Sequence, residues 1–314
     1  MASGSLNSIS TTYAGEFAKK YIAPALLKGS TLDSGGLTVK PNIKYKETMK
    51  KVATGSGVIG NAACDFSASA DKITLTERVI QPEEFQVNLE FCKKDFHNDW
   101  EAIQQGISAH DKLPPLFSDF IIAHVADLVA EQTEKNIWEG VTANAGEFDG
   151  LVTLALADSD VVDVASHAAV TASNVVGKLG SIVDAIPSTV YGSEDLFMYV
   201  SSNIYRAYTR ALGGFGAQGL GAAGYNSQGN NQDLSTGLQY DGVQLFLGRG
   251  LNDNTAMAAQ KSNLYFGTGL LADHNEVKVI DMADIDGSQN VRIVMRFTAA
   301  VQYGIGSEIV LYHA

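Results

Sequence analysis

The sequence has few of the features that mark exported, membrane-spanning or disulfide-bonded proteins. Its two cysteines, Cys64 and Cys92, are too few for a disulfide framework and lack the spacing of a metal site. No apolar run reaches the roughly 18–20 residues that a helix needs to cross a bilayer. The N-terminal stretch MASGSLNSIS has neither the basic nor the apolar region of a signal peptide. These absences predict a protein that is made and kept in a cytoplasm, with both thiols reduced.

The motifs of common enzyme classes are also missing. The sequence contains no GxSxG elbow, no HExxH pair and no GK[ST] loop. The pattern GxGxxG occurs twice, at Gly55–Gly60 and Gly214–Gly219. Neither copy stands between a buried strand and a helix start, where backbone N–H groups would meet the pyrophosphate of a dinucleotide. We therefore expect no bound cofactor and no catalytic residues.

One short segment has residues of the type that bind metals. His97, Asp99 and Glu101 alternate in DFHNDWEA and would share one face of a strand, but no second His or Cys cluster completes a site. A surface loop before Trp100 is the preferred interpretation. His124 falls on the apolar face of a predicted helix, which is typical of a core histidine. We expect no metal.

Charge is unevenly spread along a chain that is rich enough in hydrophobic residues (45%) to build a sizeable core. Residues 1–60 contain eight lysines against Glu16, Asp33 and Glu47, a net charge of +5, so the remainder carries −18 of the total −13. An acidic body binds nucleic acid poorly, because phosphate neutralisation drives sequence-independent binding. A basic arm suits pairing with another subunit or with an anionic partner; a solvated tail is the alternative.

The first 36 residues indicate an extended arm with one short helix. Tyr13, Phe17 and Tyr21 recur at four-residue spacing, which places them on one helical face, and Pro24 ends or kinks the helix. This aromatic stripe is expected to dock either on a neighbouring subunit or on the chain's own body, and the sequence leaves both open.

Residues 37–90 indicate a long two-stranded excursion. LTVKPNIKYKE begins it, and KITLTERVI and FQVNLEF return from it with period-two alternation. The stretch between them, TGSGVIGNAACDFSASAD, is rich in small residues. A ribbon this long and weakly apolar is hard to stabilise alone, so we expect a neighbouring subunit to supply a surface for it.

The strongest helix prediction covers residues 114–139. Pro114 and Pro115 suit a first helical turn, Glu131 and Lys135 form a favourable i,i+4 pair, and Gly140 is a plausible stop.

The order strand, helix, strand, helix is predicted over residues 146–212. FDGLVTLAL is expected to enter as a strand, and Ala172–Ala185 to form a helix that Pro187 ends. Asp195–Val200 fits a buried strand, and Ser202–Leu212 fits a second helix. A Gly-, Asn- and Gln-rich loop follows at 213–237, and the chain is then mostly strand to its end.

This order resembles the major capsid proteins of tailed bacteriophages, which share the Hong Kong 97-type fold. The most family-like text is SNLYFGTGLLADHNEVKVIDM, then VRIVMRFTAAVQYG and EIVLY. The resemblance implies an α+β fold with the following parts: N-terminal arm (1–36), extended β-hairpin loop (37–90), peripheral domain with the spine helix (91–145), axial domain (146–272), and return to the peripheral domain (273–314).

The same resemblance implies a structural protein. It would self-assemble into the hexamers and pentamers of an icosahedral shell that encloses phage double-stranded DNA without sequence-specific binding. Assembly would occur in the host bacterial cytoplasm and the product would be the virion capsid, with portal and decoration proteins as partners. Because the chain starts at Met1 with the arm, the built-in scaffold of some members is expected to be replaced by a separate scaffolding protein, or by none.

Three alternatives stay open from the sequence. Some family members crosslink their subunits through lysine, for which Lys40, Lys44, Lys46, Lys50, Lys51 and Lys72 are chemically suited, although lysines in a charged loop are usually only solvated. An encapsulin-type nanocompartment shell shares the implied fold but holds a cargo enzyme. A soluble cofactor-binding enzyme is a more distant alternative.

Overall fold

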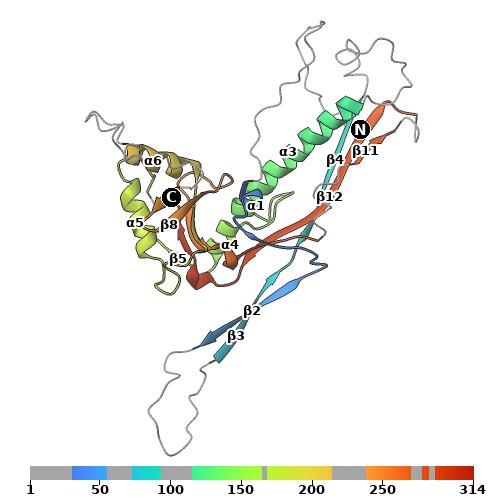
Figure 1. Ribbon diagram of the computed structural model, residues 1–314. Helices are drawn as coiled ribbons and strands as arrows, with labels where there is room; N and C mark the ends of the chain where they lie inside the picture. The colour runs from blue at the N-terminus through green and yellow to red at the C-terminus, as the bar shows by residue number, and fades with distance from the viewer. Residues whose placement is uncertain are drawn as a thin grey trace, which may run out of the picture. The chain divides into compact units, whose positions relative to one another are not determined.

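The computed structural model describes residues 30–54, 73–92, 115–164, 168–213, 238–269, 278–282 and 287–314. The helices, including two short 3-10 helices, are α1 (Ser30–Asp33), α3 (Pro115–Glu139), α4 (Leu151–Ala157), α5 (Val175–Asp184), α6 (Ser202–Gly213), η5 (Lys261–Asn263) and η7 (Gly306–Glu308). The strands are β1 (Thr38–Lys40), β2 (Glu47–Thr54), β3 (Ile73–Ile80), β4 (Glu83–Cys92), β5 (Val162–Asp163), β6 (Leu196–Val200), β7 (Gln239–Tyr240), β8 (Val243–Leu247), β9 (Ala256–Gln260), β10 (Leu264–Gly267), β11 (Lys278–Asp281), β12 (Asn290–Tyr303) and β13 (Val310–Tyr312) (Figure 1).

The described chain divides into two units, and three long elements contribute residues to both. The first unit contains residues 86–92, 115–128, 278–282 and 287–295; the second contains the other described residues. The shared elements are α3, β4 and β12. The division into arm, loop, peripheral and axial domains expected from the sequence stays a prediction, because no boundary of that scheme is tested here.

The core of the second unit is a six-stranded sheet with strand order β5-β13-β9-β6-β8-β7. β6 pairs parallel with β8 and antiparallel with β9, and β13 pairs antiparallel with β9. Successive side chains of a strand point to opposite faces. In β6, Met198 packs into one apolar cluster and Tyr199 into another, and both are buried. Both faces of the sheet are therefore covered at β6, which explains why this strand is apolar without alternation.

Helices α5 and α6 pack against one face of the sheet and form the first apolar cluster together with its strands. Val175, Leu179 and Ile182 recur at helical spacing on α5 and are buried, as is Ile204 on α6. The second cluster contains Ile137 and Trp138 of α3 with three residues of α4, namely Leu151, Val152 and Ala155. Figure 1 shows α5 and α6 beside the strands of this sheet.

A second sheet is built around the 14-residue strand β12. Its strand order is β1-β10-β12-β11, and β4 also pairs with β12. β12 pairs with β10 through residues 300–303 and with β11 through residues 291–294. β1 adds to the β10 edge as a parallel strand. Helices and sheets are thus mixed along the chain, and the expected α+β class is confirmed.

Most predicted elements of the second unit are confirmed. The helix predicted over 114–139 is α3, and its i,i+4 pair joins Lys135 Nζ to Glu131 Oε1 at 2.7 Å. The predicted helix, buried strand and helix over 172–212 are α5, β6 and α6. The stretch after residue 238, expected to be mostly strand, contains β7 to β13.

The strand predicted for FDGLVTLAL is wrong, because this segment contains helix α4. Gly150 is the N-cap residue with extended backbone, and Leu and Ala are strong helix formers. Leu151, Val152 and Ala155 are buried, so the segment presents its apolar residues at helical spacing. A short apolar run does not distinguish a buried strand from a buried helix.

The two-stranded excursion is shorter than the sequence suggested. Among the described residues of this region, only β2 and β3 pair with each other, with Glu47 opposite Ile80 and Thr54 opposite Ile73. FQVNLEF, expected in the returning arm, lies in β4, which pairs with β12 instead. LTVKPNIKYKE includes β1, which pairs with β10. We call β2 and β3 together the hairpin ribbon.

Candidate assembly surface

The hairpin ribbon is a two-stranded sheet with no third strand among the described residues (Figure 1). All eight residues of β2 face a partner in β3. The structure describes the side chains of the first five residues of β2, Glu47–Lys51, and none of them is buried. Tyr45, just before the ribbon, is 69% exposed, and Val79 on β3 is 39% exposed. A two-stranded ribbon is marginal in water, so this surface is available for an additional partner.

The end of the ribbon next to the sheets, in contrast, is fixed by an apolar contact. Ile43 and Ile80 are buried and form a small cluster with Ala300 of β12. They lie over Gly267 of β10, where an added Cβ would come within 2.7 Å of Ile80 Cδ1 and 2.9 Å of Ile43 Cδ1. The glycine therefore makes room for both isoleucines, and a side chain at this position would displace the start of the ribbon.

Backbone hydrogen bonds hold the segment before β2. The N–H of Ile43 donates to the carbonyl of Thr268 at 3.1 Å, and the N–H of Thr268 donates to the carbonyl of Lys40 at 3.1 Å. Asn42 between them has φ of 65°, a left-handed conformation that asparagine tolerates better than most residues. Lys40 Nζ also bonds Glu47 Oε1 at 2.5 Å. Two backbone hydrogen bonds thus join the chain entering β2 to Thr268, the residue after β10.

An ion pair joins the returning strand β3 to the C-terminal end of helix α4 in the same unit. Arg78 donates to Asp158, which follows helix α4, and its guanidinium lies 4.5 Å from the centre of the Tyr303 ring. The Tyr303 hydroxyl donates to Asp158 Oδ2 at 2.9 Å. An added Cβ on Gly306 would lie 2.8 Å from that oxygen, so this close arrangement requires glycine there.

The electrostatics of this group favour the charged pair. Burial opposes ionisation of Asp158, but hydrogen bonds from the Asp160 backbone N–H, from Arg78 and from Tyr303 outweigh it and hold the pKa of Asp158 below its ordinary value. Burial also opposes the charge on Arg78, yet the hydrogen bond to Asp158 and the nearby charges raise its pKa. Burial first, and then Asp158, raise the pKa of the Tyr303 hydroxyl.

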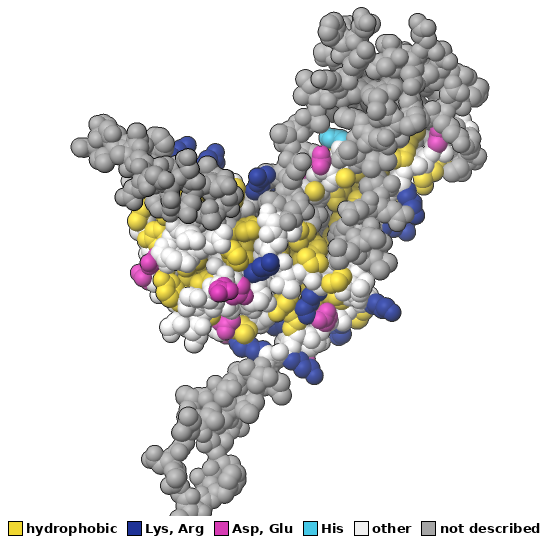
Figure 2. All heavy atoms as spheres, in the orientation of Figure 1, with side chains coloured by type: hydrophobic (Ala, Val, Ile, Leu, Met, Phe, Trp, Pro, Cys, Tyr) yellow, Lys and Arg dark blue, Asp and Glu magenta, His cyan; other side chains and the backbone are white. Residues whose placement is uncertain are grey.

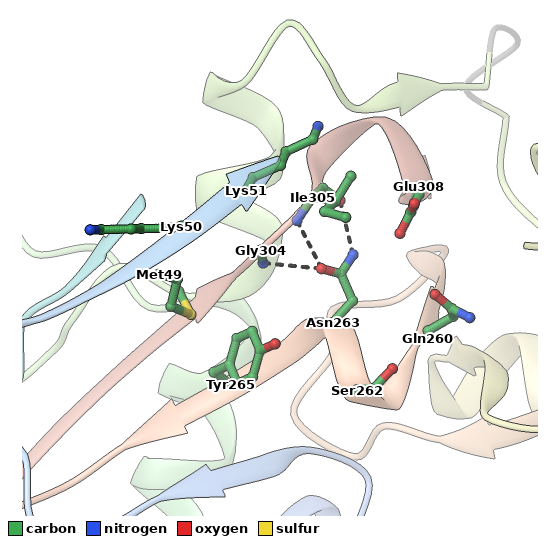
Figure 3. A pocket seen from close by; sticks show the side chains of 10 residues that line it. All are labelled: Met49, Lys50, Lys51, Gln260, Ser262, Asn263, Tyr265, Gly304, Ile305 and Glu308. Atoms are coloured by element: carbon green, nitrogen blue, oxygen red, sulfur yellow. Dashed lines mark hydrogen bonds between the residues drawn. The ribbon is translucent and has the colours of Figure 1, made fainter. Parts of the chain in front are cut away.

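A pocket of about 290 Å³ adjoins β2 and is drawn in Figure 3. The Asn263 side chain forms part of its wall: its amide oxygen accepts from the N–H groups of Gly304 and Ile305, and its nitrogen donates to the Ile305 carbonyl. Lys50 and Lys51 of β2 form no ion pair with any residue that the structure describes. Figure 3 shows both lysine side chains directed away from Asn263.

The surface around the ribbon is basic. Figure 2 shows Lys and Arg side chains gathered on the described surface near it. Lys44, Lys46 and Lys50 are exposed, and Lys51 is half-buried. Glu47 and Glu77 also lie on the ribbon, but the basic side chains outnumber them, in contrast to the net charge of −13 of the chain as a whole.

The sequence-predicted metal and cofactor motifs cannot be placed. His97, Asp99 and Glu101 lie outside the described residues, as do both GxGxxG copies, Cys64, Lys72 and the stripe of Tyr13, Phe17 and Tyr21. Cys92 is a half-buried free thiol, and His124 is half-buried on α3. Within the part of the chain that the structure describes, no three His, Cys, Asp or Glu residues gather as a metal site would require. In the same part, no helix is long and apolar enough to cross a membrane.

The residues that fix the ribbon were not found from the sequence. Arg78, Asp158 and Tyr303 are up to 225 positions apart in the printed sequence, and no local motif links them. Gly267 could have been noted as a glycine in a predicted strand, which often marks close backbone approach. Gly306 lies in the short connection between β12 and β13.

Comparison with known proteins gives a match in fold only. No known protein family and no curated protein matches the sequence. A chain from Gordonia phage Cozz matches with a TM-score of 0.61 at 13% identity, covering 100% of this chain and 96% of that one. A chain from the capsid of a native GTA particle gives 0.60 at 11% identity, with 98% and 97% covered. One from the capsid of Myoviridae phage XM1 gives 0.58 at 14% identity, with 93% and 94% covered.

These matches define the class of fold. The chain has the α+β fold of phage capsid structures over nearly its whole length, and nearly the whole length of those chains is matched in return. The resemblance to the tailed-phage capsid proteins drawn from the sequence is therefore confirmed at the level of the fold.

Proposed function

We propose that this chain is a structural subunit that self-assembles as the major capsid protein of a tailed bacteriophage. In this proposal it forms the hexamers and pentamers of an icosahedral shell, and its place is the virion. The observation that carries the proposal is the match in fold to chains of phage capsids, which covers 98% of this chain for the GTA particle and 93% for phage XM1.

The hairpin ribbon supports the same proposal on physical grounds. Its start is fixed by Ile80 and by the Arg78–Asp158 pair, while most of its described side chains are at least partly exposed. A ribbon that is held firmly at one end and unsupported along its length is suited to reach a neighbouring copy. The surface that the ribbon exposes in the isolated subunit would then be buried against a neighbouring chain. Obligate interfaces between subunits commonly bury about 2,000 Å² or more.

The acidic composition suits enclosure of DNA without tight binding. A body with a charge of about −18 outside residues 1–60 repels phosphate, so a packaged genome would stay mobile against the wall. The basic surface near the ribbon is then available for contacts between subunits. Portal and decoration proteins are the further partners that this proposal includes, together with a separate scaffolding protein or none.

The test is to express the full chain alone and to image the purified product by negative-stain electron microscopy. Closed shells or rings of subunits are the expected result. The expression is then repeated with a co-expressed scaffolding protein. A product that is uniformly monomeric at micromolar concentration in both cases would refute the proposal. Nuclease-protected DNA inside particles formed during infection supports the phage capsid. A protein cargo in place of DNA would instead indicate a nanocompartment shell.

A further inference from the structure

A buried carboxylate on α3 holds the start of the described chain. Glu134 and Thr31 are both fully buried, at 0% exposure. The Thr31 N–H donates to Glu134 Oε2 at 3.0 Å, and the Thr31 hydroxyl donates to Glu134 Oε1 at 2.5 Å. Trp138, one helical turn further along α3, donates its indole N–H to the Thr31 hydroxyl oxygen at 3.1 Å. One threonine therefore meets both carboxylate oxygens and the indole. We call these three residues the threonine clamp.

The residues around the threonine clamp leave it little room to shift. An added Cβ on Gly250 would lie 2.1 Å from the Glu134 carbonyl oxygen, so the turn after β8 lies directly against α3 at this point. The Gly36 N–H donates to the Thr31 carbonyl at 2.8 Å, and the Tyr199 hydroxyl donates to the Gly36 carbonyl at 2.6 Å. The ring of Tyr199 lies 5.1 Å from that of Trp138. Thr31 in α1 and Gly36 after it are thus both fixed against the core.

Stability alone is a weak explanation for this arrangement. A buried carboxylate loses its hydration, and hydrogen bonds must replace it; an apolar group of similar size often serves stability as well or better. What a carboxylate adds is direction, because its two oxygens accept only from donors in the right positions. Here those donors are the backbone N–H and the hydroxyl of the same residue, so Glu134 selects both the position and the orientation of Thr31.

We propose that Glu134 is a positioning residue for assembly: the threonine clamp sets the point at which the chain preceding Ser30 leaves the body. This rests on the proposed function and on one further premise, that the N-terminal segment contacts a neighbouring copy, which is one of the two docking modes that the sequence leaves open. That segment contains Lys19, Lys20 and Lys28, and any contact through these charges depends on where the segment starts. A subunit without the clamp folds, but presents the segment from a variable point.

The first measurement is limited trypsin digestion of the subunit. The Lys28–Gly29 bond lies two positions before Thr31, so its cleavage requires local opening next to the threonine clamp, and cleavage after Lys19 and Lys20 is the internal reference. Thr31→Val and Glu134→Gln are expected to raise the ratio of cleavage after Lys28 to cleavage after Lys19 and Lys20 by about tenfold. This factor corresponds to the loss of one hydrogen bond to a charged group. Thr31→Ser keeps both donors and is expected to behave like the wild type.

The second measurement is the fraction of closed shells in electron micrographs of the same variants. The matched control is Ile182→Val, a change in the other apolar cluster, used at a temperature at which its folded fraction equals that of Thr31→Val. Fewer closed shells for Thr31→Val and Glu134→Gln than for this control, with Thr31→Ser unaffected, is the expected result.

Each outcome decides the inference. An unchanged cleavage ratio overturns it, and so do shells as complete as those of the Ile182→Val control. If the wild-type chain forms no shells under any condition, the proposed function fails, and the positioning of the chain before Ser30 is then judged on the cleavage ratio alone.

Discussion

The six-stranded sheet and the hairpin ribbon belong to the same unit, yet they are stabilised in opposite ways. β6 and β9 have side chains buried on both faces, and of their ten residues only Phe197 and Gln260 are not fully buried. In β2, the described residues from Glu47 to Lys51 alternate between half-buried and exposed. The sheet thus contains its own core, whereas the ribbon has only its partner strand and the contacts at its start.

This difference implies that the sheet is stable in the isolated subunit, whereas the ribbon serves assembly. Burial of apolar surface stabilises the sheet by itself, so its integrity does not require a second copy. The ribbon contributes little apolar burial, so its removal leaves the core unchanged. The ion pair Arg78–Asp158 and the contact of Ile80 with Gly267 connect the two regions, and they determine where the ribbon begins.

The largest effect is expected from shortening the ribbon. Replacing Val52–Lys72 with a short Gly-Ser turn should leave a soluble subunit with unchanged circular dichroism in the helical region, because the six-stranded sheet and its helices are untouched. The same variant should form no closed shells by sizing chromatography and microscopy. Complete shells from the shortened chain would show that the ribbon is not an intersubunit element.

Reversing the charge near the ribbon should have the next largest effect. Changing Lys44, Lys46, Lys50 and Lys51 to Glu is expected to lower the yield of assembled particles and to remove the salt dependence of assembly, because exposed charge pairs are screened by salt. Replacement of the same four residues by Arg preserves the charge and serves as the control. Equal yield and equal salt dependence for the Glu and Arg variants would contradict the role of charge.

A matched pair of truncations compares the stability of the two regions. Met198→Ala removes a fully buried side chain between α5, α6 and the sheet, so the free energy of unfolding should fall by about 2–5 kcal/mol in urea titration. Val79→Ala on the ribbon, at 39% exposure, should change it by less than about 0.5 kcal/mol. A similar loss for both variants would mean that the ribbon belongs to the folding core.

The sequence predicted those parts of the fold that follow from local periodicity. The helices α3, α5 and α6 were predicted because their apolar spacing extends over several turns. The strand β6 was predicted because its apolar run is short and bounded by turn residues. The segment of α4 was assigned to a strand because seven residues are too few to show a period. β4 was assigned to the ribbon because alternation identifies a strand but does not identify its partner.

The assembly surface could be predicted only in outline. A basic, weakly apolar ribbon can be recognised from composition, but Arg78, Asp158 and Tyr303 come together through tertiary structure. The same is true of Thr31 and Glu134, which are 103 positions apart. Such contacts between distant residues follow from the fold, so a single sequence contains no pattern that reveals them.

A pH titration tests the smallest effect, that of the ion pair at the start of the ribbon. The pKa of Asp158 is held below its ordinary value of 3.8 in the folded chain, so folding favours the ionised form. The stabilisation is therefore fully present above the unfolded-state pKa and is lost as the pH falls through the lower folded-state value. Asp158→Asn should be less stable than the wild type at neutral pH, and the difference should shrink in acid below pH 3.8. A difference that is constant with pH would contradict this role.

Hydrogen–deuterium exchange in the free and assembled states is the most direct test that the ribbon is completed by a neighbouring copy. Amides of β2 and β3 should exchange rapidly in the free subunit and about tenfold or more slowly in the shell, because an added partner suppresses local opening. Amides of β6 and β9 should exchange equally slowly in both states, since this sheet is already covered. Ribbon amides that exchange at the same rate in the subunit and in the shell would contradict the account.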